Sequence, residues 1–144
     1  MPPPAPDLQR FVDAQADVHE QALAEIRRGR KTSHWMWFVF PQIAGLGSSP
    51  TARFYALASL DEARAYAAHP ILGPRLRTCA EAVAGLAGRT AAEVFGHPDD
   101  LKLRSSLTLF EVADPGCDAY ARALDAVCEG RRDGQTLQRL GIRP

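Results

Sequence analysis

Residues 31–42 read KTSHWMWFVFPQ, and this stretch contains both tryptophans of the chain. A basic, hydroxyl-rich lead-in runs directly into an apolar block. Burial of each large apolar side chain stabilises a fold by roughly 1.5–3 kcal/mol. We therefore expect residues 31–42 to form the packing centre of the protein. Polar groups beside aromatic rings are also the composition of many ligand pockets.

The length and charge of the chain indicate how many domains it forms and which partners it can bind. Its 144 residues, 46% of them hydrophobic, predict a single domain over residues 1–144, with residues 1–6 as a flexible proline-rich tail. Basic and acidic residues balance at 17 each, giving a formal net charge of +0. Proteins that bind nucleic-acid backbones need a basic surplus, so a nucleic-acid partner is not expected.

The chain also lacks the sequence features of a membrane or exported protein. No apolar run approaches the ~18 residues that span a bilayer, and the first residues do not resemble a signal peptide. The three cysteines, Cys79, Cys117 and Cys128, are odd in number and widely spaced, which is typical of reduced thiols. We predict a cytoplasmic protein without membrane association. The oligomeric state is left open.

Apolar residues recur at helical spacing along most of the chain, and no clear strand pattern occurs. This predicts an all-α fold of about seven or eight short helices. The first helix is expected to start at the Asp7 cap and to end at Gly29. Ser33 is the expected cap of a short helix before Pro41, although a buried strand also fits those aromatic residues. The other expected helices cover residues 51–58, 60–68, 70–86, 91–95, 99–110 and 117–129.

One candidate site lies on the helix that follows Asp99. Lys102, Ser105 and Ser106 have the spacing i, i+3, i+4 and therefore share a face. An ammonium group beside two hydroxyls predicts a small anion-binding surface. The alternative is that these side chains only face water.

A second candidate site lies at residues 69–75. His69 and Pro70 begin a helix whose first N–H groups attract anions. Gly73 would permit close approach of a ligand, and Arg75 could bind a phosphate with two parallel hydrogen bonds. The alternative is an ordinary helix start with exposed arginines.

The opening stretch supplies the third group of candidates. Lys31 is predicted to bind phosphate, His34 to transfer a proton, and Trp35 or Trp37 to stack on a flat ring. Gln42 closes this stretch and joins the predicted ligand set. The alternative is that both tryptophans are core residues and His34 is a buried imidazole with satisfied hydrogen bonds. Residues 45–49 read GLGSS and predict either a loop that closes over a ligand or a surface turn.

No metal site is predicted, because the histidines are scattered and the cysteine and histidine spacings of metal motifs are missing. No cofactor is predicted either, since neither a phosphate-binding loop signature nor a dinucleotide fingerprint is present.

The chain resembles the domain of unknown function 1810 family. The resemblance is carried by residues 31–42, by Gly45-Leu46-Gly47, by the segment from Ser59 to Leu76, and by the segment from Val94 to Phe110. It implies a mainly helical fold and no established activity.

A weaker similarity links the chain to the NADAR group, which acts on ADP-ribose derivatives and includes N-glycosidases. It rests on Lys31 ahead of the aromatic block, on the turn from Leu72 to Arg75, and on the Lys102 helix. The acidic signature of that group has no clear counterpart here. This similarity implies binding of an ADP-ribose-type ligand.

Together, these observations predict binding of a small anionic metabolite of the phosphorylated ribosyl or ADP-ribose type. Lys31, Arg75 and Lys102 would bind phosphate. His34 or a nearby carboxylate would protonate the leaving nitrogen of an N-glycosidic bond. The alternatives are a non-catalytic metabolite-binding module and a protein-interaction module.

Overall fold

The computed structural model describes residues 7–143, and these residues form ten helices. The tail predicted for residues 1–6 lies outside this range. The all-α prediction is confirmed, although the chain divides into more helices than expected. In chain order the helices are α1 (Gln9–Gln15), α2 (His19–Arg28), α3 (Met36–Val39), α4 (Pro50–Phe54), α5 (Leu60–Ala68), α6 (Leu72–Ala84), α7 (Ala91–Phe95), α8 (Asp99–Ala113), α9 (Ala119–Val127) and α10 (Gly134–Arg139).

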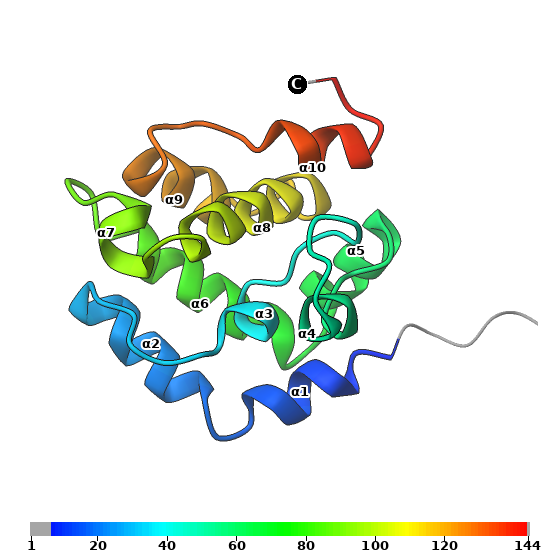
Figure 1. Cartoon of the computed structure of the whole chain (residues 1–144), viewed down its shortest axis with the longest axis horizontal. Coiled ribbons are helices and arrows are strands. Elements are labelled where there is room, and N and C mark those ends of the chain that lie inside the picture. Colours follow the sequence, from blue (N-terminus) through cyan, green and yellow to red (C-terminus); the bar gives the residue numbers. More distant parts are fainter. Residues whose placement is uncertain (1–6, 144) are drawn as a thin grey trace, which may run out of the picture.

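Helix α8 occupies the centre of the molecule (Figure 1). It packs against α3, α5, α7, α9 and α10. Every residue from Leu103 to Phe110 is buried except Arg104, as expected for a helix with neighbours on most sides. Helix α6 forms the second packing axis and contacts α2, α5 and α9. Helices α1 and α2 run along the lower edge in Figure 1, and α10 lies above α8.

The aromatic stretch around Trp35 forms part of the core, as predicted. Trp35 and Phe40 are fully buried. Their rings lie 6.4 Å apart, and each meets Phe95 of α7 edge-on at 6.1 and 6.2 Å respectively. Aromatic rings at such separations attract one another beyond the effect of buried area. Residues 35–40 therefore join α7 to the centre of the protein.

Local capping chemistry places several helix ends where the sequence predicts them. Gly29 ends α2 with a φ of +79°, a conformation that glycine adopts without strain. Thr90 and Glu93 form a complete capping box at α7. Ser59 and Glu62 also have the spacing of a capping box, but only half of that box forms. The Ser59 hydroxyl accepts from the Glu62 N–H, but the Glu62 carboxylate accepts instead from the N–H of Ala58.

Two predicted helices are shorter in the structure because tertiary contacts interrupt them. The helix expected up to Gly29 divides after Gln15, whose buried amide donates to the Phe38 carbonyl at 2.6 Å. The helix expected over residues 51–58 ends at Phe54. Just beyond it, Leu57 pairs with Ile43 in an isolated parallel bridge, which needs an extended backbone.

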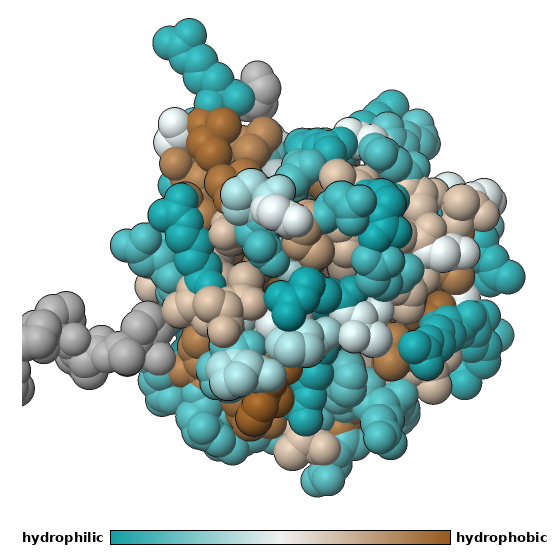
Figure 2. Space-filling view, turned by 180° about the vertical axis from the view of Figure 1, so that it is seen from behind, coloured by the Kyte–Doolittle hydropathy of each residue, from teal (hydrophilic) through white to brown (hydrophobic). Residues whose placement is uncertain are grey.

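The surface is mainly polar. Figure 2 shows one face on which hydrophilic residues dominate and hydrophobic residues appear at separate places. The large apolar side chains that are exposed, Phe54, Ile71, Leu101 and Ile142, belong to different elements. Within residues 7–143, no helix combines the length and the apolar character that crossing a membrane requires.

Candidate functional site

Two lysines from distant segments meet at one carboxylate. The Lys31 ammonium lies 2.9 Å from Asp99 Oδ2, and the Lys102 ammonium lies 3.6 Å from Asp99 Oδ1. Lys31 also donates to the Ser33 carbonyl at 2.6 Å. Asp99 begins α8, where the helix dipole favours a negative side chain. The two lysines of the chain therefore belong to a single charged cluster.

Each of these ammonium groups also lies over a tryptophan. Lys31 Nζ is 5.0 Å from the centre of the Trp35 ring, and Lys102 Nζ is 4.8 Å from that of Trp37. Cations at this distance are attracted to the negative face of the ring. Trp35 is fully buried, whereas Trp37 is a partly exposed residue. Only Trp37 presents a surface on which a ligand could stack in this conformation.

Glu25 holds the segment that carries Lys31 in place. Its buried carboxylate accepts hydrogen bonds from the backbone N–H groups of Thr32 and Ser33, from the Ser33 hydroxyl, and from Trp35 Nε1. Burial would raise the pKa of Glu25, but these hydrogen bonds outweigh it and lower the pKa to about 2. Ser33 therefore binds Glu25 and does not cap α3, in contrast to the prediction.

A cavity of about 290 Å³ opens beside this cluster. Lys102, Arg104 and Ser105 reach it from α8, and Gln42 reaches it from the end of the aromatic stretch. The Gln42 amide donates to the Ser105 hydroxyl at 2.7 Å. Arg104 lies 3.7 Å from Asp133, which caps α10. Asp133 itself also lines the cavity, and the remaining lining residues are Leu46, Gly47, Ala52, Pro98, Leu101 and Gln135.

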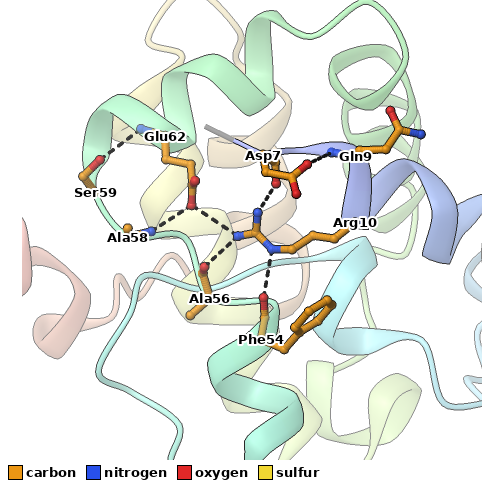
Figure 3. A network of polar contacts seen from close by, with 8 residues as sticks. All are labelled: Asp7, Gln9, Arg10, Phe54, Ala56, Ala58, Ser59 and Glu62. Atoms are coloured by element: carbon orange, nitrogen blue, oxygen red, sulfur yellow. Dashed lines mark hydrogen bonds and ion pairs between the residues drawn. The ribbon is translucent and has the colours of Figure 1, made fainter. Parts of the chain in front are cut away.

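One wall of the cavity comes from the loop before α4 and from α4 itself, which has no buried residue. Arg10 braces the end of this helix (Figure 3). Its guanidinium donates to the carbonyls of Phe54 at 2.8 Å and Ala56 at 3.1 Å, and it pairs with Glu62 at 3.3 Å. It also donates to the Asp7 carbonyl. Arg10 thereby ties α1, α4 and α5 together behind the cavity wall.

Five of the predicted site residues in the aromatic stretch and on α8 lie outside the cavity lining: Lys31, His34, Trp35, Trp37 and Ser106. His34 is exposed on the loop between Lys31 and Trp35, which excludes the buried imidazole considered as an alternative. Ser106 is fully buried, and its hydroxyl has no hydrogen-bond partner within the described part of the chain. The predicted shared face with Lys102 therefore holds for Ser105, whereas Ser106 turns into the core.

The second predicted site is located elsewhere, at the junction of α5 and α6. The His69 imidazole accepts from the N–H groups of Ile71 and Leu72, so it caps the start of α6. A side chain at Gly73 would collide with the Ala67 carbonyl, 2.2 Å from the position of a Cβ atom. Arg75 is partly buried and lies near His19, where burial and this positive charge lower the pKa of the imidazole. None of these three predicted residues lines the Lys102 cavity.

Cys79 and Cys128 are not activated nucleophiles. All three thiols are free, as predicted. Burial raises the pKa of Cys79 to about 12 and that of Cys128 to about 11. Both groups therefore remain protonated thiols at neutral pH.

Sequence reasoning does not single out Asp99, Arg104 or Glu25. The spacing of Asp99 and Lys102 is the one that brings opposite charges together on a helix. Glu25 falls between Ala22 and Ile26 on the apolar face of its helix, and an acidic residue on such a face signals a buried hydrogen-bonded carboxylate. Arg104 carries no comparable signal, because α10 brings Asp133 to it from a distant part of the sequence.

Comparison with known proteins agrees with this fold. The crystal structure of the conserved hypothetical protein Rv1873 from Mycobacterium tuberculosis, at 1.38 Å, superposes with a TM-score of 0.91 and shares 49% identity. The similarity covers 94% of this chain and 97% of the other. No curated protein matches the chain. The model of the protein of unknown function family DUF1810 matches residues 5–140, and the chain therefore belongs to that family.

Proposed function

We propose that this protein binds a small anionic metabolite of the phosphorylated ribosyl or ADP-ribose type in the Lys102 cavity. The observation that carries this proposal is the convergence of Lys31 and Lys102 on Asp99 beside a cavity that also holds Arg104. An ammonium and a guanidinium are the side-chain groups that bind phosphate oxygens. The amide of Gln42 and the hydroxyl of Ser105 offer hydrogen bonds to ribose.

Lys102 is the residue assigned to phosphate, and Lys31 is assigned a positioning role. The Lys31 side chain is only 7% exposed and holds both Asp99 and the Ser33 carbonyl at close distance. The Lys102 side chain is 24% exposed, and its contact with Asp99 is longer. Lys102 can therefore exchange its partner for a ligand at lower cost. Trp37, under the Lys102 ammonium, offers the ring for stacking.

A more specific proposal is that the protein also cleaves an N-glycosidic bond of the bound ligand. Asp99, next to the cavity residue Pro98, is a carboxylate that could stabilise positive charge on a ribosyl ring. His34 lies on the same loop as Lys31 and is the candidate acid for the leaving nitrogen. The two alternatives are a binding module without catalysis and a protein-interaction module. The scattered exposed apolar residues favour a metabolite over a protein partner.

The test is calorimetry with ADP-ribose, NAD and ribose 5-phosphate, for the native protein and for Lys102→Gln. We expect Lys102→Gln to weaken binding about tenfold or more, because a charge-assisted hydrogen bond is lost. Thermal unfolding provides a second measurement. A ligand at about 100 times its Kd should stabilise the native protein by about 2.7 kcal/mol.

The matched control is Arg64→Gln, which removes one positive charge from an exposed position on α5 outside the cavity. It should leave affinity unchanged. Equal affinity of Lys102→Gln and the native protein would reject the site. Chromatography of the incubated ligand then separates an N-glycosidase, which releases free base, from a binding module, which returns the ligand intact.

A further inference from the structure

We infer that residues 45–54 form a lid over the Lys102 cavity, with Arg10 of α1 at its hinge and Arg139 of α10 as its latch. These ten residues, called the lid segment below, comprise the loop before α4 and α4 itself. The role of the lid in ligand entry rests on the proposed function. Its opening, by contrast, can be measured without any ligand.

The lid segment lies on the surface of the protein, with its inner side against the cavity. Eight of its ten residues are exposed, and none is buried. The two that are partly buried, Leu46 and Ala52, both line the Lys102 cavity. Segments with so few buried contacts open at a fraction of the free energy of global unfolding. The lid segment can therefore leave the cavity while the rest of the fold stays intact.

The two ends of the lid segment meet at a fixed base. The Ala44 N–H donates to the Leu57 carbonyl at 2.8 Å, and the Leu57 N–H donates to the Gln42 carbonyl at 2.9 Å. Surface loops of about 6–16 residues whose ends lie this close are frequently functional. The base also holds Gln42, whose amide binds Ser105 in the cavity. Motion of the lid segment about this base leaves both of these cavity residues in place.

Two arginines hold the lid segment beyond its base, and they hold it with unequal strength. Arg10 donates to the Phe54 carbonyl at 2.8 Å, pairs with Glu62, and has a side chain that is only 16% exposed. Arg139 is exposed and reaches the segment through one hydrogen bond, from Nη2 to the Gly45 carbonyl at 3.2 Å. One exposed hydrogen bond breaks more readily than several part-buried ones. The Arg139 end therefore opens first, and the Arg10 end serves as the hinge.

The latch fits a glycine at position 45. The φ of Gly45 is +99°, and a Cβ atom there would be 2.4 Å from Arg139 Nη1. The guanidinium thus lies directly against the bare Cα of Gly45. Figure 1 shows the loop before α4 reaching towards α10, which carries Arg139. This close approach secures the loop without burying either residue, so the latch opens without removing a side chain from the core.

Opening of the lid should also unwind α4. This helix has five residues and no buried side chain, and a helix of this length is not stable in water by itself. The Arg53 N–H donates to the Ser49 carbonyl at 3.0 Å, and the Tyr55 N–H donates to the Thr51 carbonyl at 3.2 Å. The exchange of these two amide protons with solvent therefore reports the open state.

The experiment is native-state hydrogen exchange, followed by NMR in the absence of ligand. In the native protein, the amides of Arg53 and Tyr55 should exchange at least about a hundredfold faster than that of Leu107 in the buried part of α8. Arg139→Ala removes the latch and keeps a strong helix former in α10. It should speed the exchange of the Arg53 and Tyr55 amides about fivefold, as expected for one lost hydrogen bond.

Two further variants serve as controls. Arg64→Ala removes another exposed arginine, on α5, and should leave the exchange of the Arg53 and Tyr55 amides unchanged. Gly73→Ala disturbs the packing of α5 on α6 and should speed the exchange of the Leu107 amide. It should not change the exchange of the Arg53 and Tyr55 amides, because opening of the lid leaves α5 and α6 in place.

The inference is overturned if Arg53, Tyr55 and Leu107 exchange at one rate in the native protein, or if Arg139→Ala leaves the first two rates unchanged. Saturating ADP-ribose should slow the exchange of both lid amides. If calorimetry detects binding but neither ADP-ribose nor Arg139→Ala affects these amides, the lid fails and the Lys102 site stands. If Arg139→Ala speeds their exchange but no ligand binds, the latch stands and the proposed function fails.

Discussion

At the scale of single residues, Glu25 orders the segment that carries Lys31. It is an acidic side chain buried in the core, and a buried charge is tolerated only when hydrogen bonds compensate its lost hydration. Thr32, Ser33 and Trp35 supply those bonds from the segment that also presents Lys31. The position of Lys31 over Trp35 therefore depends on a carboxylate that contacts no part of the cavity lining.

We predict that stability falls when Glu25 becomes protonated. The pKa of Glu25 in the folded protein is about 2, below its ordinary value of 4.5, so ionised Glu25 stabilises the fold above pH 4.5. This contribution, about 2–3 kcal/mol, is lost as the pH falls from 4.5 towards 2. Urea unfolding of the native protein and of Glu25→Gln should differ by about that amount at pH 7 and by less than half as much at pH 3.

Glu20→Gln is the control for this measurement, because Glu20 is exposed on the same helix. It should change the free energy of unfolding by less than about 1 kcal/mol. The interpretation of Glu25 is wrong if Glu25→Gln remains as stable as the native protein at pH 7.

At the scale of the elements, the contact of α5 with α6 depends on Gly73. This glycine lies in the first turn of α6, where the sequence suggests close approach of a ligand. In the structure, the close neighbour is the carbonyl of Ala67 at the end of α5. His69 caps the same turn. The motif at residues 69–75 is thus accounted for by the packing of two helices.

We predict that Gly73→Ala destabilises the protein by about 1–3 kcal/mol, the usual cost of forcing a group into a packed interface. The added Cβ would meet a backbone oxygen at 2.2 Å, and a backbone atom cannot rotate away. Gly85→Ala at the other end of α6 is the matched control. A Cβ at Gly85 would be 3.4 Å from the Ala82 carbonyl oxygen, an ordinary contact distance, and its φ of −76° suits alanine.

Urea unfolding measures both glycine variants. Gly85→Ala should keep or slightly raise the stability, because alanine restricts the unfolded chain. If the two variants are equally stable, close packing is not the reason for glycine at position 73.

At the scale of the whole molecule, one arginine connects three parts of the chain. Arg10 bonds the carbonyls of Phe54 and Ala56 and the carboxylate of Glu62 (Figure 3). The planar guanidinium fork reaches all of these acceptors at once, whereas an ammonium cannot. Arg10 therefore fixes α4, which lacks a buried residue, as a wall of the Lys102 cavity.

We predict that Arg10→Lys lowers the free energy of unfolding by about 1–3 kcal/mol, although the charge is kept, because several charge-assisted hydrogen bonds are lost. Chemical denaturation measures this change. Arg64→Lys is the control, since Arg64 has one long contact to Asp61 on the surface and should have little effect. If Arg10→Lys has the same free energy of unfolding as the native protein, the planar geometry of the Arg10 guanidinium is not required.

The sequence by itself determined the helical class, the capping box at Thr90 and Glu93, and the end of α2 at Gly29. These features depend on periodicity and on hydrogen bonds between residues a few positions apart, so a short window of sequence contains their cause. Only the tertiary structure decided that Asp99 joins Lys31 to Lys102, that Trp37 remains partly exposed, and that Arg139 lies on Gly45. These contacts arise when distant helices pack, and no local pattern specifies which distant side chains then meet.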